Sequence, residues 1–175
     1  MILTPTAIAG AYVIDIEPRR DERGFFARTF CREELTAYDL EADVVQANVS
    51  WNQQRGTLRG LHYQAVPHEE TKIVRCTRGA IWDVLLDLRP ASATFGRWHA
   101  EELTADNHRM LYIPRGFAHG YLTLADDTEV FYLVGHRYVP ESGRGVRWDD
   151  PAFAIQWPFQ PSVISAADRS HALWP

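Results

Sequence analysis

Lysine is almost absent from this sequence. Its 18 basic residues comprise 17 arginines and a single lysine, Lys72. A chain that uses arginine wherever it needs a surface cation has little reason to keep one lysine. We therefore interpret Lys72 as a position that needs a compact ammonium with a tunable pKa. The alternative is an exposed lysine that escaped the bias, and composition alone leaves both interpretations open.

Cysteine is also scarce, and long apolar runs are missing. The two cysteines, Cys31 and Cys76, form no disulfide framework and suit a reducing compartment. No apolar run approaches the ~20 residues that cross a bilayer, and the N-terminus lacks the charged start and apolar core of a signal peptide. The net charge of -5 argues against nucleic-acid binding, since phosphate backbones attract basic surfaces. We expect a soluble, cytoplasmic protein that binds neither membrane nor nucleic acid.

Several catalytic motifs are missing from the chain. No serine lies in a Gly-x-Ser-x-Gly turn, which argues against a serine-hydrolase triad. The chain has no Walker-type loop and no Gly-x-Gly-x-x-Gly segment. These absences argue against nucleotide hydrolysis and against a nicotinamide cofactor bound in the Rossmann manner.

Short apolar runs separated by turn residues fill most of the sequence, with ten prolines and eleven glycines between them. This pattern predicts strands at residues 11–16, 25–30, 44–50, 58–64, 72–76, 80–88, 98–103, 110–113, 120–124 and 129–134, and one helix at 33–40. It indicates one all-β domain over residues 1–175, a cupin-like jelly-roll sandwich or barrel with one or two short helices. We expect the tail from Pro151 onward to pack over the outside of the sheets.

Two of these strands carry polar side chains among apolar ones. In residues 44–50, Gln46, Asn48 and Ser50 share one face, which is either the lining of a ligand cavity or a solvated sheet surface. In residues 80–88, Asp83 lies within an apolar run. A buried carboxylate of this kind is expected to be paired or functional.

A metal site is one interpretation of the seven histidines. The segment from Pro114 to His119 resembles the second motif of cupin metalloenzymes. Their first motif requires His-x-His, whereas this chain has His62-Tyr63-Gln64 at that place. Two ring nitrogens without a third ligand make a poor zinc or iron site, so we expect a cupin barrel without a metal.

Acid–base chemistry without a metal is the second interpretation. His62 would be the base, and it needs a carboxylate partner to fix its tautomer. Asp83 and Asp168 are both candidates for that partner, and the residues alone do not choose between them. Lys72, on the next strand, could stabilise a developing oxyanion.

Two tyrosines, Tyr132 and Tyr138, could return a proton from the opposite side of a substrate. The third interpretation is that these polar groups only form hydrogen bonds inside the core, which is the commoner role for any single histidine. That interpretation weakens here because His, Lys, Arg, Gln and Asn side chains all fall on strands expected to line one barrel.

Seven segments together resemble a known family over nearly the whole chain: residues 21–26, 46–48, 56–64, 72–75, 78–84, 113–120 and 148–151. Among them, Arg-Gly-Leu-His-Tyr-Gln at 59–64 and Gly-Phe-Ala-His-Gly at 116–120 are the most specific. The family is that of the dTDP-4-dehydrorhamnose 3,5-epimerases. The resemblance implies a cofactor-independent epimerase, usually a homodimer with a jelly-roll core, that acts on a nucleotide-linked 4-keto-6-deoxy sugar.

The resemblance also implies roles for individual residues. His62 would be the base and Asp168 its partner, Lys72 would hold the enolate oxygen, and Tyr132 would donate the returning proton. Further residues would bind the substrate: Arg23 and Arg59 at the diphosphate, and Phe26, Gln46, Asn48, His119 and Tyr138 along the nucleotide and sugar pockets.

Some positions depart from the family pattern, which often has acids at Arg28 and Gly143 and lysines at Leu133 and Ala167. These departures leave the acid–base residues intact, but they leave open the nucleotide, the sugar and the number of carbons inverted. The main hypothesis is inversion at both C3 and C5. The alternatives are an epimerase that inverts one centre only, in natural-product or surface-glycan synthesis, and a cupin that binds a sugar nucleotide without turnover.

Overall fold

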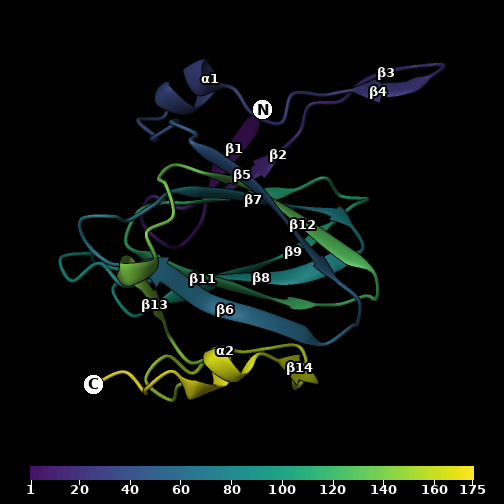
Figure 1. Cartoon of the computed structure of the whole chain (residues 1–175). Helices are drawn as coiled ribbons and strands as arrows, with labels where there is room; N and C mark the ends of the chain where they lie inside the picture. Colours follow the sequence, from purple (N-terminus) through teal and green to yellow (C-terminus); the bar gives the residue numbers. More distant parts are fainter.

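The computed structural model describes residues 1–175 and consists mainly of two β-sheets that face each other (Figure 1). The first sheet has the order β1 (Ile2–Pro5), β2 (Tyr12–Asp15), β10 (Met110–Ile113), β7 (Lys72–Arg78), β12 (Thr128–Val134) and β5 (Gln46–Asn52). The second has the order β13 (Gly143–Gly145), β6 (Thr57–Gln64), β11 (Phe117–Thr123), β8 (Ala80–Asp87) and β9 (Trp98–Thr104). The predicted all-β jelly roll is confirmed.

The remaining elements lie at the ends of this sandwich (Figure 1). A hairpin of β3 (Arg19–Asp21) and β4 (Gly24–Phe26) extends away from both sheets. The helix α1 (Arg32–Thr36) lies near β1, whereas β14 (Val163–Ile164) and α2 (Ala166–Ser170) lie against β6. A 3-10 turn, η1 (Pro140–Ser142), precedes β13. None of the helices is both long and apolar enough to pass through a bilayer.

Strand β8 is buried on both faces, which fits its nearly continuous run of apolar residues. Ile81 and Leu85 belong to the core between the sheets, whereas Val84 and Leu86 belong to a second apolar cluster on the opposite face. Residues of the C-terminal tail, including Phe153, complete this second cluster. The expectation that the tail packs over the outside of a sheet is therefore confirmed.

The structure differs from the sequence prediction mainly at the ends of elements. The helix expected at 33–40 stops at Thr36, because Leu35 is its only buried residue and Asp39 has a positive φ of 57°. The strand expected at 25–30 ends at Phe26, where the hairpin projects and no further strand pairs with it. The pattern did not predict β1, β3, β13, β14 or α2, which are short.

Candidate active site

A cavity opens between the two sheets, where β5, β7 and β12 face β6 and β11. We call the part lined by Tyr138 the outer part and the part lined by Tyr132 the inner part. Their volumes are about 410 Å³ and about 400 Å³ respectively. The two parts adjoin, because both are lined by Asn48, His62, Lys72 and Val134. The polar face predicted for residues 44–50 lines this cavity, so it is not simply a solvated sheet surface.

A close approach of β6 and β11 brings His62 and Arg59 to the same cavity. His62 pairs with His119, and a register shift then places Arg59 opposite Tyr121. The approach depends on Gly60, because a Cβ atom there would lie only 2.6 Å from the Cα atom of Gly120. Gly60 also has a φ of +116°, which a residue with a side chain rarely adopts.

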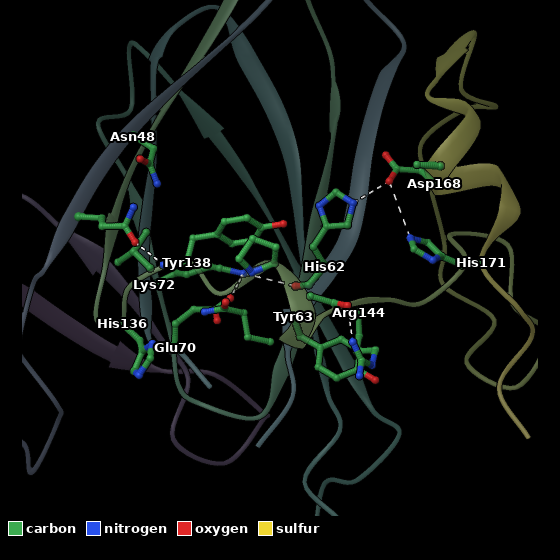
Figure 2. A pocket seen from close by; sticks show the side chains of 16 residues that line it. Asn48, His62, Tyr63, Glu70, Lys72, His136, Tyr138, Arg144, Asp168 and His171 are labelled. Atoms are coloured by element: carbon green, nitrogen blue, oxygen red, sulfur yellow. Dashed lines mark hydrogen bonds and ion pairs between the residues drawn. The ribbon is translucent and has the colours of Figure 1, made fainter. Parts of the chain in front are cut away.

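The carboxylate of Asp168 lies directly beside the ring of His62 (Figure 2). His62 Nε2 is 2.6 Å from Asp168 Oδ1, and Asp168 Oδ2 accepts a hydrogen bond from the Gly60 N–H at 3.3 Å. Ser165 caps α2 by accepting the Asp168 N–H at 3.0 Å, which fixes the carboxylate on the first turn. Burial alone would raise the pKa of Asp168, but the hydrogen bond from His62 and the others hold it below its ordinary value.

Asp83, the other candidate partner, forms a different pair. Its Oδ1 atom is 2.7 Å from Nε2 of His119, and both side chains are buried. The expectation that Asp83 is paired is confirmed. The carboxylate that contacts His62 is that of Asp168. Since His62 and Asp168 are 106 positions apart, only the folded chain could distinguish the two carboxylates.

Lys72 is held by contacts on two sides (Figure 2). Its Nζ lies 2.9 Å from Oε1 of Glu70 and donates to the backbone oxygen of His62 at 3.3 Å. The side chains of Lys72 and Glu70 are only 14% and 7% exposed, so Lys72 is not a free surface cation. Sequence reasoning missed Glu70, because nothing in the amino-acid sequence distinguishes it from its neighbour Glu69.

The two candidate tyrosines lie in different parts of the cavity. Tyr132 faces the inner part, with its ring centroid 6.1 Å from that of His119. Burial of its hydroxyl raises the pKa of Tyr132 well above the ordinary value, so the phenol stays protonated. Tyr138 lies at the outer part, is 64% exposed, and its backbone N–H donates to Oε1 of Gln46 at 2.6 Å.

The predicted substrate-binding residues divide into two groups. Gln46 and Asn48 line the outer part of the cavity, and Arg59 lines the inner part, where its Nε donates to Asn52 Oδ1 at 2.7 Å. Arg23 and Phe26 lie instead on the projecting hairpin (Figure 1). Within one chain, the structure does not bring these two hairpin residues to the cavity.

A third histidine, which the sequence did not single out, lies beside the His62–Asp168 pair. His171 Nε2 is 3.9 Å from Asp168 Oδ1 (Figure 2). The donor atoms of His62, Asp168 and His171 all lie within 4.8 Å of one another, so these three are the residues that could hold a metal ion. No sequence motif links these three positions.

The arrangement combines a carboxylate-paired imidazole, a partly buried ammonium and a protonated phenol around one cavity. An imidazole with a carboxylate partner can accept a proton from carbon, and an ammonium can stabilise the enolate oxygen that forms. A phenol on the other sheet can then return a proton. The site therefore suits proton transfer next to a carbonyl group.

Comparison with known proteins gives a consistent result. The chain matches the family model of dTDP-4-dehydrorhamnose 3,5-epimerase over residues 5–175. A dTDP-4-dehydrorhamnose 3,5-epimerase of Sinorhizobium fredii is 44% identical over 158 residues, which cover 89% of this chain and 81% of that protein.

Solved structures are similar over almost the whole chain. A dTDP-4-dehydrorhamnose 3,5-epimerase of Bacillus anthracis, with TDP and PPi bound, has a TM-score of 0.95 at 39% identity and covers 99% of both chains. A 3'-monoepimerase from Streptomyces bikiniensis in complex with dTDP-quinovose has a TM-score of 0.88 at 33% identity. That match covers 97% of this chain and 86% of the other.

Proposed function

The chain belongs to the dTDP-4-dehydrorhamnose 3,5-epimerase family, and from this membership we propose that His62 and Tyr132 are the base and the acid of its reaction. The enzyme is an isomerase that inverts C3 and C5 of a dTDP-linked 4-keto-6-deoxyhexose in deoxysugar biosynthesis of the dTDP-L-rhamnose type. The observation that carries the proposed roles is the 2.6 Å contact between His62 and Asp168 in the cavity that also contains Lys72.

Proton abstraction starts from the tautomer of His62. Its Nε2–H donates to Asp168, which leaves the lone pair of Nδ1 free to accept a proton from C3 or C5. The C4 ketone acidifies both positions, because the carbanion is delocalised onto the ketone oxygen as an enolate. The Lys72 ammonium, already fixed by Glu70, stabilises that oxygen electrostatically.

Inversion requires that the proton returns from the opposite face of the sugar. Tyr132 lies on β12 in the first sheet, whereas His62 lies on β6 in the second sheet. The raised pKa of Tyr132 keeps its proton in place until the enolate forms. After each inversion His62 holds one extra proton and Tyr132 lacks one, so exchange with water resets both groups.

We also propose that the enzyme is a homodimer in which each projecting hairpin serves the cavity of its partner. Phe26 on the hairpin is 76% exposed, and the guanidinium of Arg23 is bound only by the neighbouring Asp21. The edge strand β5 beside the cavity exposes Val49 and Trp51, which provides apolar surface for a second copy. The diphosphate would then lie between Arg59 and the partner's Arg23.

A cytoplasmic location is part of the same proposal. Cys31 and Cys76 are free thiols in the structure, and a reducing compartment keeps such thiols unpaired. Nucleotide-linked sugars as substrates fit this location.

Inversion of a single centre is the second candidate function. It is favoured by the likeness to the Streptomyces bikiniensis 3'-monoepimerase, which extends over 97% of this chain. One inversion needs the same base, cation and acid as two, so the residues of the cavity serve both outcomes.

Turnover in heavy water distinguishes the two functions. The enzyme would be incubated with dTDP-4-keto-6-deoxyglucose in D₂O, and the sugar analysed by mass spectrometry and NMR. Deuterium at both C3 and C5 supports the double epimerase, and deuterium at one carbon supports the single-centre function.

The matched control is His62→Ala, which should bind dTDP but lose enzyme-dependent exchange by about 10²–10⁴-fold. Exchange by His62→Ala at the wild-type rate would contradict the role of His62 as base. Wild-type protein that binds dTDP without any exchange would instead support a cupin that binds the sugar nucleotide without turnover.

A further inference from the structure

His171 is a partly buried group next to the reactive pair that the proposed reaction does not use. It follows α2 directly, and its ring lies edge-on to that of His62 with 6.3 Å between centroids (Figure 2). Its Nε2 atom is buried and has no hydrogen-bond partner, although Asp168 Oδ1 is 3.9 Å away. An unsatisfied buried nitrogen beside a carboxylate calls for a ligand, because leaving it unpaired is costly.

The position of His171 is shaped by the strand next to His62. Gly145 on β13 is the direct partner of His62 on β6. A Cβ atom at Gly145 would lie 2.0 Å from Nε2 of His171, so the missing side chain makes the space that the imidazole occupies. The pairing of β13 with β6 and the end of α2 therefore bring a second imidazole to the His62–Asp168 pair.

The spacing of the three donor atoms suits a single metal ion. A tetrahedral zinc ion bonded at about 2.1 Å to each ligand holds its donors about 3.4 Å apart. The three donors lie within 4.8 Å of one another, with 2.6 Å between His62 Nε2 and Asp168 Oδ1 and 3.9 Å between His171 Nε2 and Asp168 Oδ1. Binding an ion therefore requires side-chain rotations that open the His62–Asp168 contact and bring His171 closer, and the side chain of His171 is 27% exposed at the end of a helix.

We propose that His62, Asp168 and His171 form a binding site for Zn²⁺ or a similar divalent transition-metal ion, and that the bound ion switches the enzyme off. Two imidazoles and one carboxylate are a ligand set that zinc favours, and they leave its fourth position for water. Ca²⁺ and Mg²⁺ prefer oxygen ligands and should bind far more weakly.

Inhibition follows from the proton on the His62 ring. The ion needs the lone pair of Nε2, so the proton that Nε2 donates to Asp168 must move to Nδ1, and the neutral ring keeps its single proton there. Nδ1 then has no lone pair with which to accept a proton from the sugar. This inhibition rests on the proposed role of His62 as base, whereas binding of the ion does not.

The test uses protein without a histidine tag. Calorimetric titration with ZnCl₂ should show one ion per chain, and Co²⁺ should give the visible absorption of a four-coordinate site. Epimerisation should fall as Zn²⁺ occupies the site and return on addition of EDTA. His171→Ala should raise the concentrations of Zn²⁺ that half-saturate and half-inhibit the enzyme by about 10–100-fold, each activity being referred to the same variant without zinc.

Two further variants keep the test specific. Gly145→Ala retains all three donors but fills the space of the His171 ring, so it should also weaken zinc binding. His99→Gln removes an imidazole from β9, at the opposite edge of the same sheet, and should behave as wild type. Far-ultraviolet dichroism and thermal unfolding confirm that each variant is folded.

Three results would count against the proposal. Absence of a stoichiometric ion in the wild type overturns the site, as does equal zinc sensitivity of wild type and His171→Ala. Zinc that binds through His171 but leaves epimerisation unchanged overturns the inhibition. The ion site would then stand without its effect on the reaction, and the role of His62 as base is decided separately by the exchange assay of His62→Ala.

Discussion

Glu70 holds the ammonium of Lys72 in position, although Glu70 itself transfers no proton in the proposed reaction. Glu70 Oε1 lies 2.9 Å from the ammonium, and its other oxygen, Oε2, is buried without a hydrogen-bond partner. Lys72 would otherwise be held only by the backbone oxygen of His62 at 3.3 Å. Glu70 therefore acts as a positioning residue, since it fixes the cation toward which the enolate oxygen forms.

Replacement of Glu70 should slow the reaction more than it weakens substrate binding. We expect Glu70→Ala to lower kcat by about 10–100-fold with little change in KM, because a displaced cation loses stabilisation of the enolate. Glu70→Gln should retain more activity, since its amide oxygen still accepts a hydrogen bond from Lys72. Steady-state kinetics of both variants measure this, with Glu69→Ala as the control. Wild-type kcat in Glu70→Ala would contradict the positioning role.

Sequence reasoning at the scale of residues found the chemical types but not all of their contacts. The single lysine pointed to Lys72, and the structure places it beside His62 in the cavity. Glu70 and His171 were missed, because their importance comes from neighbours that only the fold brings together. An irregularity in β6 was missed as well. Arg59 and His62 are three positions apart and would point to opposite faces of a regular strand, but the register shift between them lets both line one cavity.

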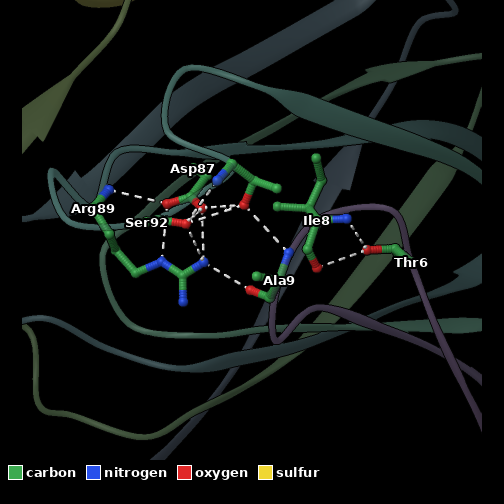
Figure 3. Close-up of polar contacts among 7 residues, drawn as sticks. Thr6, Ile8, Ala9, Asp87, Arg89 and Ser92 are labelled. Atoms are coloured by element: carbon green, nitrogen blue, oxygen red, sulfur yellow. Dashed lines mark hydrogen bonds and ion pairs between the residues drawn. The ribbon is translucent and has the colours of Figure 1, made fainter.

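At the scale of elements, a buried carboxylate joins the end of β8 to the N-terminal segment (Figure 3). Asp87 accepts hydrogen bonds from Arg89, Ser92 and Thr94, at 2.9, 2.6 and 2.7 Å for the Nε, Oγ and Oγ1 donors. Arg89 in turn donates to the backbone oxygen of Ala9 at 2.7 Å. Burial alone would raise the pKa of Asp87, but these donors lower it to about 2.

Loss of this carboxylate should destabilise the fold without altering the cavity. We expect Asp87→Asn to lower the free energy of unfolding by about 3 kcal/mol, because it leaves the Arg89 charge without its buried partner. Urea unfolding at neutral pH measures the change. Asp106→Asn, at an exposed turn, is the control and should alter stability by less than about 0.5 kcal/mol. Equal stability of Asp87→Asn and wild type would contradict the role of the cluster.

The same cluster makes a definite contribution to acid stability. Since the pKa of Asp87 falls from 3.8 in a free carboxyl to about 2 in the fold, its contribution is present above pH 3.8. That contribution, about 2 kcal/mol, is lost as the pH falls from 3.8 toward 2. Asp87→Asn should therefore lose less stability than wild type over this range.

The alternating pattern of β8 shows how far elements could be predicted. It assigns Val84 and Leu86 to one face and Leu85 to the other, and the structure buries both faces in separate apolar clusters. It did not predict that Asp87, on the same face as Leu85, holds Arg89, which in turn binds Ala9, 80 positions before Arg89 in the chain. Strand periodicity fixes the face of a side chain, whereas its partner depends on the path of the whole chain.

At the scale of the whole molecule, the hairpin of β3 and β4 pairs with no other strand of the same chain. Every residue of β3 and β4 is exposed, yet the resemblance implies substrate contacts for Arg23 and Phe26. Sequence alone could not separate contacts within a chain from contacts between two chains, because both leave the same motif. The proposed homodimer resolves this, since the hairpin of each copy would reach the cavity of the other.

Hybrid dimers test this exchange directly. Chains carrying His62→Ala and Arg23→Ala would be expressed together with different affinity tags, and the hybrid isolated on both. If the hairpins are exchanged, one cavity carries both defects and the other has intact His62 and Arg23, so the hybrid should regain about half of wild-type activity. If each hairpin served its own cavity, every cavity would carry one defect and the hybrid would show only the mean of the two parents. Light scattering of the wild type establishes the dimer first, and a monomeric active enzyme would contradict the exchange.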